Sequence, residues 1–481
     1  MTAAVATSDP RASQAAAEVI RSGGNAIDAA VTAAFVLYVV EPQSCGIGGD
    51  GFMFVHNQPG PPIGLDGSGA VPAGLTREAL AADGLDNVPA RGAKTATPPG
   101  AVALLESALH QFGTIGLRDA IAPALQFARE GFSVRPTLAV AAARATADLA
   151  SEPVLGPLYW PGGNAVVEGA TVLNPALADA LTLIAREGSS AILTGALAHA
   201  IVDAIEAGGG YLSRADLAAH GTVTVDPVRV DFAGHRMWQM PSPTQGPAVL
   251  AALRNLSSKG SSKGASNGNA EGDIDWDAAY HAVAAGMIEA GFDPSNVGTS
   301  TPSPAKGDTT YIAAVDHDGR GASLITSVFG DFGSHLGVKA LGGPIHNRAT
   351  TFRLVSRPIS QGKPPHTTIP GLITRADGSL RFVLGVAGGV MQPQTQVQLT
   401  LRTLLENLDP QAAIDKPRFK ICFGGDLALE AGHPLAALYP DALNKNPGPE
   451  GFGAAQMIGW HDGELCAGAD ARRGGHAIVI E

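Results

Sequence analysis

The sequence predicts an α+β protein, because helical patterns fill its first part and strand patterns follow Thr309. Before residue 290, apolar residues recur many times with the spacing of a buried helix face. Beyond Thr309, runs rich in β-branched and aromatic residues predict strands. These candidate strands are residues 309–315, 322–329, 381–386 and 426–430, and one long helix is expected at about 392–407.

Two helices are predicted at the start of the chain. Pro10 suits the first helical position after Ser8-Asp9 and opens a helix over residues 11–22. Asn25 caps a second helix, residues 26–39, whose apolar residues run almost all round and predict burial. Further helical patterns recur at residues 101–112, 117–130, 136–149, 175–187, 194–208, 246–256 and 276–290.

The composition favours a large core and argues against a nucleic-acid partner. The 481 residues include 44 acidic and 32 basic side chains, for a formal net charge of −12, and 45% are hydrophobic. That hydrophobic share supports a large core, and an acidic chain is repelled by a phosphate backbone. Cys45, Cys422 and Cys466 are too few and too scattered for a disulfide framework or a zinc site. We expect them to be reduced and buried.

We expect a cytoplasmic protein without a membrane partner. The N-terminus has neither a basic region nor a long apolar region of the kind found in signal peptides. The longest apolar run, residues 26–40, contains Asp28 and is shorter than the roughly 20 residues that span a bilayer. Whether a signal peptide has been removed stays open.

Two polar segments interrupt the helical part. Residues 257–273 are low-complexity Ser, Gly, Lys and Asn, which bury too little apolar surface to offset chain entropy, so a disordered insertion is predicted there. Residues 291–308 are rich in Pro, Ser, Thr and Gly and lead directly to Thr309.

A hairpin is predicted around Thr309. The strand that begins there meets an Asp-Gly turn at residues 318–319, and residues 322–329 return beside it. This register places Thr310 opposite Ser327, within one residue. The hairpin therefore brings the Ser327 hydroxyl back beside the start of the strand.

Segments along nearly the whole chain match one known family in order and spacing. They are residues 21–30 (RSGGNAIDAA), 41–52 (EPQSCGIGGDGF), 97–100 (TPPG), 122–124 (APA), 128–132 (AREGF), 308–310 (DTT), 388–389 (GG), 417–419 (PRF) and 470–475 (DARRGG). On these segments the chain resembles the γ-glutamyltranspeptidase family of N-terminal-nucleophile hydrolases. The resemblance implies a four-layer αββα sandwich and a chain that cuts itself before Thr309. Residues 1–308 would form a large fragment and residues 309–481 a small one, intertwined as one unit.

The resemblance makes Thr309 the expected nucleophile. A threonine hydroxyl needs a neighbouring base, and a cut before Thr309 frees an α-amine to act as one. The reference pKa of an α-amine is about 7.7–8.0, which suits proton transfer near neutral pH. The same hydroxyl would first attack the carbonyl of Asp308 to give an ester that water opens. Thr310 is the alternative nucleophile, although the family pattern favours the first threonine.

Two further groups take catalytic roles from the resemblance. Ser327 stands where a family threonine orients the amine of the nucleophile. Gly388 and Gly389 match the oxyanion hole, where backbone N–H groups stabilise the tetrahedral intermediate. A strand serine or a Gly-Gly pair is otherwise an ordinary surface or turn feature, so position alone makes these residues candidates.

The glycine motif at residues 46–51 fits the G-x-G-x-x-G pattern of dinucleotide-binding folds. Such a fold needs the motif after a strand and before a helix, whereas here it follows a helix and precedes a strand at residues 52–56. We therefore interpret it as a tight loop packed near the active site, with no nucleotide cofactor.

The expected substrate pocket departs from true γ-glutamyltranspeptidases. Ser68 replaces the arginine that holds the glutamyl carboxylate, and His366 and Thr367 replace two serines that share this task. The acids that bind the substrate ammonium are replaced by Thr350 and Thr351. A family asparagine near the nucleophile is replaced as well, by a phenylalanine at position 329.

These changes resemble the acylase-like branch that includes oxamate amidohydrolase. Arg348, Lys363 and His366 are candidate partners for a substrate carboxylate, although each is more often a solvated surface charge. His335 and His346 are also expected near the pocket. We expect neither a metal nor a cofactor, because no tight His/Cys cluster is present.

The sequence thus predicts a self-processing hydrolase of small-molecule amides that forms an acyl-Thr309 ester. Three alternatives stay open: a relative that cleaves another bond, such as a carbon–carbon bond; a γ-glutamyl hydrolase or transpeptidase; and an unprocessed relative that only binds. The substrate, the balance of hydrolysis and transfer, and the oligomeric state are not determined. Nor is it determined whether residues 291–308 permit self-cleavage.

Overall fold

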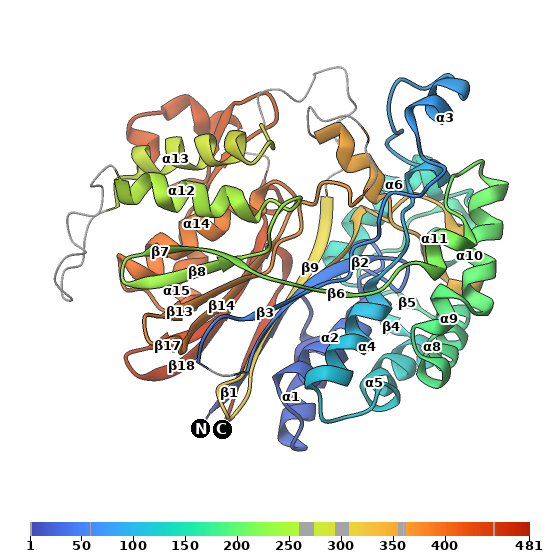
Figure 1. Ribbon diagram of the computed structural model, residues 1–481, viewed down its shortest axis with the longest axis horizontal. Coiled ribbons are helices and arrows are strands. Elements are labelled where there is room, and N and C mark those ends of the chain that lie inside the picture. Colours follow the sequence, from blue (N-terminus) through green and yellow to red (C-terminus); the bar gives the residue numbers. More distant parts are fainter. Residues whose placement is uncertain are drawn as a thin grey trace.

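Two antiparallel sheets lie face to face in the centre of the protein, and helices cover the outer face of each (Figure 1). The computed structural model describes residues 2–57, 59–258, 274–293, 307–354, 359, 362–445 and 448–481. The arrangement confirms the four-layer αββα sandwich expected from the sequence.

The first sheet combines strands from both ends of the chain. In spatial order it contains β19 (His476–Ile480), β1 (Ala3–Thr7), β9 (Gly307–Val315), β10 (Gly321–Gly330), β2 (Asp50–His56), β3 (Ile63–Asp66) and β6 (Val223–Val225). Ala3 in β1 pairs with Ile480 in β19, so the two termini lie together (Figure 1). Segments from before and after Thr309 therefore belong to one sheet.

The second sheet comes mostly from the last third of the chain. Its order is β18 (Glu464–Ala469), β17 (Ala454–His461), β14 (Leu380–Ala387), β13 (Gly371–Arg375), β8 (His235–Gln239) and β7 (Val228–Phe232). An apolar layer that includes Tyr311, Phe52 and Val383 fills the space between the two sheets.

Each sheet has its own helical layer. The first is covered by α1 (Pro10–Arg21), α2 (Ala26–Val40) and α4 (Ala101–Phe112), with α5 (Leu117–Glu130), α6 (Pro136–Leu149), α8 (Pro175–Glu187) and α10 (Ala196–Ala207) packed around them. The second is covered by α12 (Gly246–Ser258), α13 (Trp276–Glu289), α14 (Met391–Leu404) and α15 (Pro410–Asp415). Shorter elements are α3 (Arg77–Ala82), α7 (Gly156–Tyr159), α9 (Ser190–Leu193), α11 (Arg214–Ala218), β4 (Phe132–Ser133), β5 (Thr171–Val172), β11 (Gly337–Val338), β12 (Gly343–Pro344), β15 (Phe419–Ile421) and β16 (Leu427–Leu429).

Helix α2 shows how the local sequence builds this layer. Asn25 accepts hydrogen bonds from the N–H groups of Ile27 and Asp28, and the Asp28 carboxylate accepts one from Asn25 in return. This capping box satisfies N–H groups that the first helical turn leaves unpaired. All 15 residues of α2 are buried, as its apolar pattern predicted.

The two-residue period of β9 sends neighbouring side chains to opposite faces of the sheet. Tyr311 and Ala313 belong to the layer between the sheets, whereas Ile312 and Ala314 belong to the layer under the helices. Thr309 therefore shares the inter-sheet face with Tyr311, whereas its neighbour faces the helices.

Strand β14, in the second sheet, packs against β9 in the first sheet and runs toward the first residues of β9. Near one end, a Cβ on Gly321, which pairs with Val315, would lie 2.6 Å from Leu380. Farther along, a Cβ on Gly385 would lie 2.2 Å from the Tyr311 ring. The Gly388–Gly389 turn follows the last residue of β14, at the end of this strand that lies toward the start of β9.

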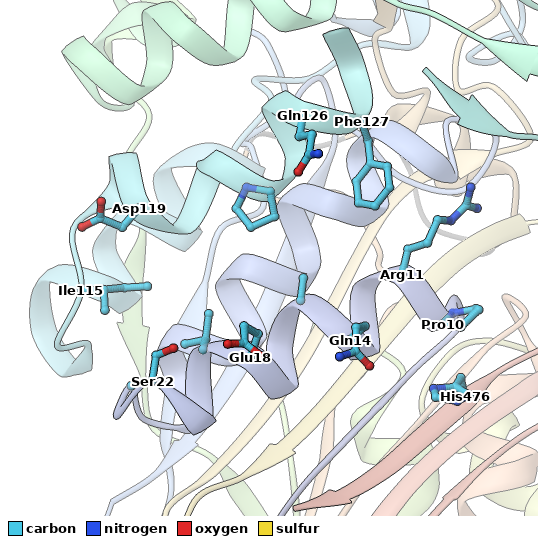
Figure 2. A pocket seen from close by; sticks show the side chains of 14 residues that line it. Pro10, Arg11, Gln14, Glu18, Ser22, Ile115, Asp119, Gln126, Phe127 and His476 are labelled. Carbon is cyan, nitrogen blue, oxygen red and sulfur yellow. The ribbon is translucent and has the colours of Figure 1, made fainter. Parts of the chain in front are cut away.

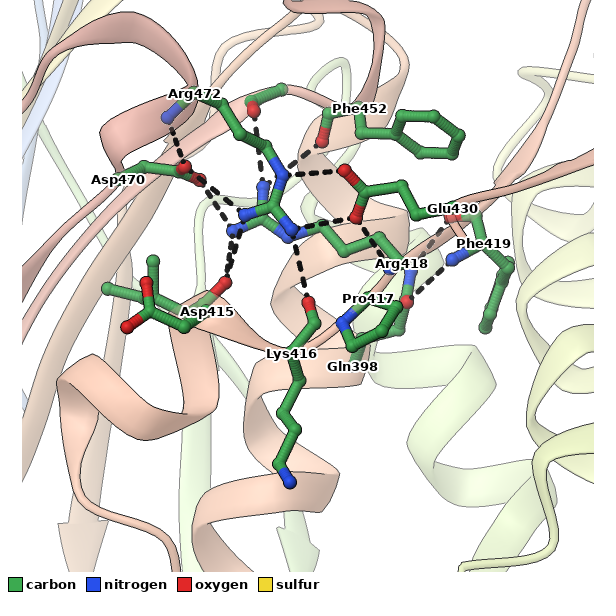
Figure 3. A network of polar contacts seen from close by, with 12 residues as sticks. Gln398, Asp415, Lys416, Pro417, Arg418, Phe419, Glu430, Phe452, Asp470 and Arg472 are labelled. Carbon is green, nitrogen blue, oxygen red and sulfur yellow. Dashed lines mark hydrogen bonds and ion pairs between the residues drawn. The ribbon is translucent and has the colours of Figure 1, made fainter. Parts of the chain in front are cut away.

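Two of the segments that carry the family resemblance form a structural network (Figure 3). Arg418 is fully buried and donates to Asp470 at 2.6 Å, and Asp470 also accepts from the N–H of Ala455 in β17 at 3.1 Å. Arg472 donates to Glu430 at 2.7 Å. These residues join α15, β17 and the last loop, so they stabilise the second sheet and contribute no group to the candidate site.

The sequence predicted the long helices well and the short strands poorly. Helices α4, α5, α6 and α8 have the predicted bounds, and α12 extends two residues further. Ser257 and Ser258 end α12, so the predicted disorder was wrong for them, whereas residues 259–273 and 294–306 lie outside the described residues. The expectation of buried cysteines holds for Cys45, whereas Cys422 and Cys466 are only partly buried.

The strands that were missed depend on tertiary pairing. Strand β1 is rich in alanine, which has low strand propensity, and it forms because β9 and β19 pair with it on both sides. The same prediction missed β3, β6, β7, β8, β13, β17, β18 and β19.

Ser190–Ala207 is the one described stretch long and apolar enough to cross a membrane by composition. The structure divides it at Thr194 and Gly195 into α9 and α10, and α10 buries Leu197 and Ile201 against neighbouring helices. The apolar residues of this stretch thus contribute to the first helical layer.

The contact between Gly385 and Tyr311 predicts a large effect of one methyl group. Gly385→Ala should lower the free energy of unfolding by about 1–3 kcal/mol, because the Tyr311 hydroxyl is held by Ser323 at 2.7 Å and the ring has little room to move. Gly221→Ala is the matched control, since a Cβ at Gly221 meets no atom within 4 Å. Urea unfolding of both variants tests this, and equal midpoints would contradict it.

Candidate active site

The hairpin brings the two expected hydroxyl groups into contact. Thr309 Oγ1 donates a hydrogen bond to Ser327 Oγ at 3.1 Å, and both side chains are buried. The register pairs Thr326 with Thr310 and then shifts before Phe329, so the predicted pairing was right within one residue. The register shift is a local irregularity of the kind that re-aims side chains at the end of a strand.

Phe329 fixes the position of Ser327. The N–H of Phe329 donates to Ser327 Oγ at 2.8 Å, and the backbone of Phe329 adopts a left-handed φ of 74°. A left-handed conformation costs a bulky residue about 1–2 kcal/mol, so the surrounding fold holds this strain beside Ser327. The Phe329 ring faces the guanidinium of Arg348, with its centroid 5.0 Å from Cζ.

The glycine loop packs directly against this hairpin. A Cβ on Gly48 would lie 2.3 Å from the carbonyl oxygen of Pro344, and one on Gly49 would lie 2.6 Å from that of Ser327. The carbonyl of Gly48 also accepts from the N–H of His346 at 3.0 Å. The glycines therefore allow close backbone packing beside the candidate site, as expected.

Asp50 is the centre of the buried charge at the site. It is the cross-strand partner of Ser327, so the two side chains are neighbours on the inter-sheet face. Arg348 donates to both carboxylate oxygens, from Nε at 2.8 Å and from Nη2 at 2.6 Å, and both residues are fully buried. Burial by itself raises the pKa of Asp50, but the charge of Arg348 holds this pKa well below its usual value.

Two histidines complete the surroundings of Asp50. His346 Nδ1 lies 3.4 Å and His366 Nε2 lies 3.7 Å from Asp50 Oδ2. Burial lowers the pKa of His366 well below its usual value, and the charge of Arg348 lowers it further. The His366 ring is therefore neutral at neutral pH. Of the three histidines expected near the pocket, these two are brought together, whereas His335 instead lies 3.8 Å from Asp148.

Ser68 and Lys363 meet at a second carboxylate, Asp66. The Oγ of Ser68 donates to Asp66 at 2.6 Å, and Lys363 Nζ lies 2.7 Å from the other carboxylate oxygen. Asp66 pairs with Phe52, two residues along β2 from Asp50, so this group lies next to the first. The charge of Lys363 is therefore compensated within the protein, and the hydroxyl of Ser68 is already engaged.

The threonines in place of the family acids are engaged as well. Thr350 Oγ1 donates to the carbonyl of Pro89 at 3.0 Å, and Thr351 Oγ1 donates to that of Arg348 at 2.7 Å. Both are buried, as is Thr367, which adjoins His366. Neither Thr350 nor Thr351 supplies a negative charge for a substrate ammonium.

Gly388 and Gly389 have φ values of 136° and 57°, which favour glycine over any residue with a side chain. They connect β14 to α14, whose first N–H groups bond back to them: Met391 to Gly388 at 3.0 Å and Gln392 to Gly389 at 3.2 Å. The turn is therefore built where a helix begins, and helix N-termini attract negative charge.

Sequence reasoning missed Asp50. It stood inside a matching segment, yet its pairing with Arg348 depends on residues 298 positions apart. The available signal was a carboxylate just before the apolar run at residues 52–55, because a charge buried with such a strand needs a partner.

Two other kinds of site are not found at these residues. In the described part of the chain, no three His, Cys, Asp or Glu side chains are placed to hold a metal ion. A groove of about 800 Å³ opens between α1 and α5, where Figure 2 shows Phe127, Gln14 and Glu18 around it. Its lining includes no residue of β9, β10 or the Gly388–Gly389 turn.

Comparisons with known proteins agree with this architecture. The sequence model of the gamma-glutamyltranspeptidase family matches residues 12–290 and 270–480. The glutathione hydrolase-like YwrD proenzyme of Bacillus subtilis is 30% identical over 85% of this chain and 83% of its own length. The oxamate amidohydrolase proenzyme of Klebsiella pneumoniae is 29% identical with the same coverage. Cephalosporin acylase from Bacillus halodurans is 30% identical in sequence. Its crystal structure superposes on this chain with a TM-score of 0.86, and the match covers 99% of this chain and 95% of that one.

The pairing of Asp50 with Arg348 predicts a non-additive effect on stability. Asp50→Asn leaves a buried guanidinium without its anion and should cost about 3–5 kcal/mol. Replacing both residues, as Asp50→Leu with Arg348→Met, should recover most of this loss. Urea unfolding in a Thr309→Ala background compares the variants as uncut chains, and additive losses would contradict the pairing.

The same pair sets a pH dependence of stability. The pKa of Asp50 is lowered in the folded state, so its contribution is present above its unfolded pKa of about 3.9 and is lost as pH falls through the lower folded value. The Asp50→Asn chain should lack this part of the acid sensitivity.

Proposed function

Because this chain belongs to the γ-glutamyltranspeptidase family and is an amidohydrolase of that family, we propose that it cuts itself before Thr309 and then uses Thr309 to hydrolyse small-molecule amides. The observation that carries this proposal is the hydrogen bond from Thr309 to Ser327. The proenzyme relatives support processing of a precursor into two fragments.

Self-cleavage follows from the position of the hydroxyl. Thr309 Oγ1 attacks the carbonyl carbon of Asp308, and the hydroxyl proton passes to the peptide nitrogen, which leaves as the α-amine of Thr309. The result is an ester between Asp308 and Thr309, which water hydrolyses to a free carboxylate and a free hydroxyl. The new α-amine is then the base beside the nucleophile.

Turnover repeats this chemistry on a substrate. The α-amine accepts the hydroxyl proton as Oγ1 attacks the amide carbon, and the N–H groups at Gly388 and Gly389 stabilise the oxyanion. The proton passes to the leaving amine, which departs and leaves an acyl-Thr309 ester. Water then releases the acid and regenerates the hydroxyl. Ser327 accepts the hydrogen bond that orients Thr309 before attack.

The charges at the site favour an acyl group with a carboxylate and no ammonium. Within the described residues, Arg348 Nη1 and His366 Nε2 are buried without a hydrogen-bond partner, so each can meet a carboxylate oxygen. Lys363 is the weaker candidate, because Asp66 already compensates its charge. Oxamate, named in one relative, carries a carboxylate beside its amide and no ammonium.

Self-cleavage should convert the purified protein from one chain into two fragments. Purified protein should separate on a denaturing gel into fragments of 308 and 173 residues, and the smaller should begin Thr309-Thr310-Tyr311. Thr309→Ala should stay one chain because no hydroxyl attacks Asp308, whereas Thr309→Ser keeps a hydroxyl and should be cut. Intact wild-type chain that still turns over amides would refute the mechanism.

Three anilides that differ by one group each test which charges the substrate site accepts. Glutaryl-p-nitroanilide should exceed γ-glutamyl-p-nitroanilide in kcat/KM by roughly 30- to 150-fold, the equivalent of one charged contact of about 2–3 kcal/mol. The ammonium of the γ-glutamyl compound finds no acid at Thr350 or Thr351. Butyryl-p-nitroanilide, which lacks the carboxylate, is the control and should be slower than the glutaryl compound. A preference for the γ-glutamyl compound would overturn the assignment.

A further inference from the structure

The start of β9 is supported unevenly by its two neighbouring strands. On one side, β10 pairs with it from Val315 to Thr310 and again at Asp308 and Gly307. On the other side, β1 pairs only with Ala313–Val315 among the described residues. Strand β1 ends at Thr7 and the chain turns into α1, so it gives no ladder partner to the residues that surround the proposed cut.

A chain of side-chain hydrogen bonds takes over where β1 ends. Ser8 Oγ lies 2.6 Å from Thr310 Oγ1 and donates to Glu41 Oε2 at 2.8 Å. A hydroxyl has one proton, and Ser8 gives its proton to the carboxylate, so Thr310 is the donor to Ser8. The order Thr310 to Ser8 to Glu41 connects β9 to the end of α2.

These polar groups are buried between β9 and the helices that cover the first sheet. Ser8, Glu41 and Thr310 are each at most 7% exposed, and the next inward side chain of β9 on this face is Ile312. Burying a polar group costs free energy unless the group is hydrogen-bonded. An apolar residue at position 310 would fill the same space and would need no hydrogen-bond partner. The hydrogen bonds therefore indicate that these residues hold the start of β9 in place, and that stabilising the core is not their main role.

We propose that Ser8 and Glu41 clamp Thr310 and so position the new N-terminus once the chain is cut. The proposal rests on the proposed function, because it takes Thr309 as the nucleophile. The cut removes Asp308 and Gly307, with their pairing to β10, from the strand. Thr310 is then the first residue held from both sides, by Thr326 across the ladder and by Ser8 through its hydroxyl.

The alternation of the strand explains why the clamp acts on the nucleophile. The Thr310 side chain points into the helical layer. Holding it there fixes the backbone of β9, and so fixes the direction in which Thr309 points between the two sheets. Chain termini otherwise fray, and a displacement of about 1 Å costs roughly 100-fold in rate at a reacting centre. Ser8, Glu41 and Thr310 are thus positioning residues that touch neither substrate nor reacting atoms.

Kinetics of processed variants test the clamp. With glutaryl-p-nitroanilide, Thr310→Val and Ser8→Ala should each lower kcat by roughly 10- to 100-fold and leave KM within about twofold, since only the nucleophile is displaced. The double variant should be no worse than the poorer single one, because the residues act as a unit. Thr310→Ser keeps the hydroxyl and should restore kcat to within about threefold.

Thr32→Val is the matched control. Thr32 lies in α2 in the same layer, and its buried hydroxyl has no hydrogen-bond partner among the described residues, so kcat should not change. An unchanged kcat in Thr310→Val, or equal losses in Thr310→Val and Thr310→Ser, would overturn the clamp. If instead Thr309→Ala is as active as wild type, the proposed function fails.

Hydrogen–deuterium exchange tests the clamp without any assay of activity. In uncut Thr309→Ala chains, amides at residues 309–312 should exchange roughly tenfold faster when Ser8→Ala is added, and no faster with Thr32→Val. Equal exchange in all three chains would show that Ser8 does not hold the strand, whatever the enzyme turns over.

Discussion

The two-residue period of β9 is the constraint on which the site depends. It sends Thr309 between the sheets and Thr310 under the helices, so adjacent threonines cannot exchange roles without moving the whole strand by one residue. Pairing with β10 and packing of Tyr311 against Gly385 prevent such a slip. The sheet thus places the two candidate nucleophiles on opposite faces.

Two buried or partly buried ion pairs determine the charges around the candidate site. Asp50 with Arg348 and Asp66 with Lys363 place two carboxylates and two cations on neighbouring strands and loops. Because each of these two carboxylates already has its cation, neither offers a free negative charge to an ammonium. Among the described residues, Arg348 Nη1 has no hydrogen-bond partner, and this is the basis of the proposed preference for a substrate carboxylate.

Local sequence was enough to predict the helices, because capping and apolar spacing act within a few residues. Asn25 forms the predicted cap, which Asp28 completes, and α4, α5, α6 and α8 have the predicted bounds. Strands β1 and β17 were missed because their stability comes from partners far along the chain. In the candidate site, the contact between Thr309 and Ser327 was predicted correctly because a short hairpin joins them.

By itself, the sequence determined the helices, the hairpin and the order of segments that marks the family. These features depend on short separations or on residue identity alone. Only the tertiary structure decided which side chains share a face and a charge. Ser8 meets Thr310 across 302 positions and Asp50 meets Arg348 across 298, and no local pattern encodes such contacts. They exist because strands from both ends of the chain join β9 in one sheet, which is packed between a helical layer and the second sheet.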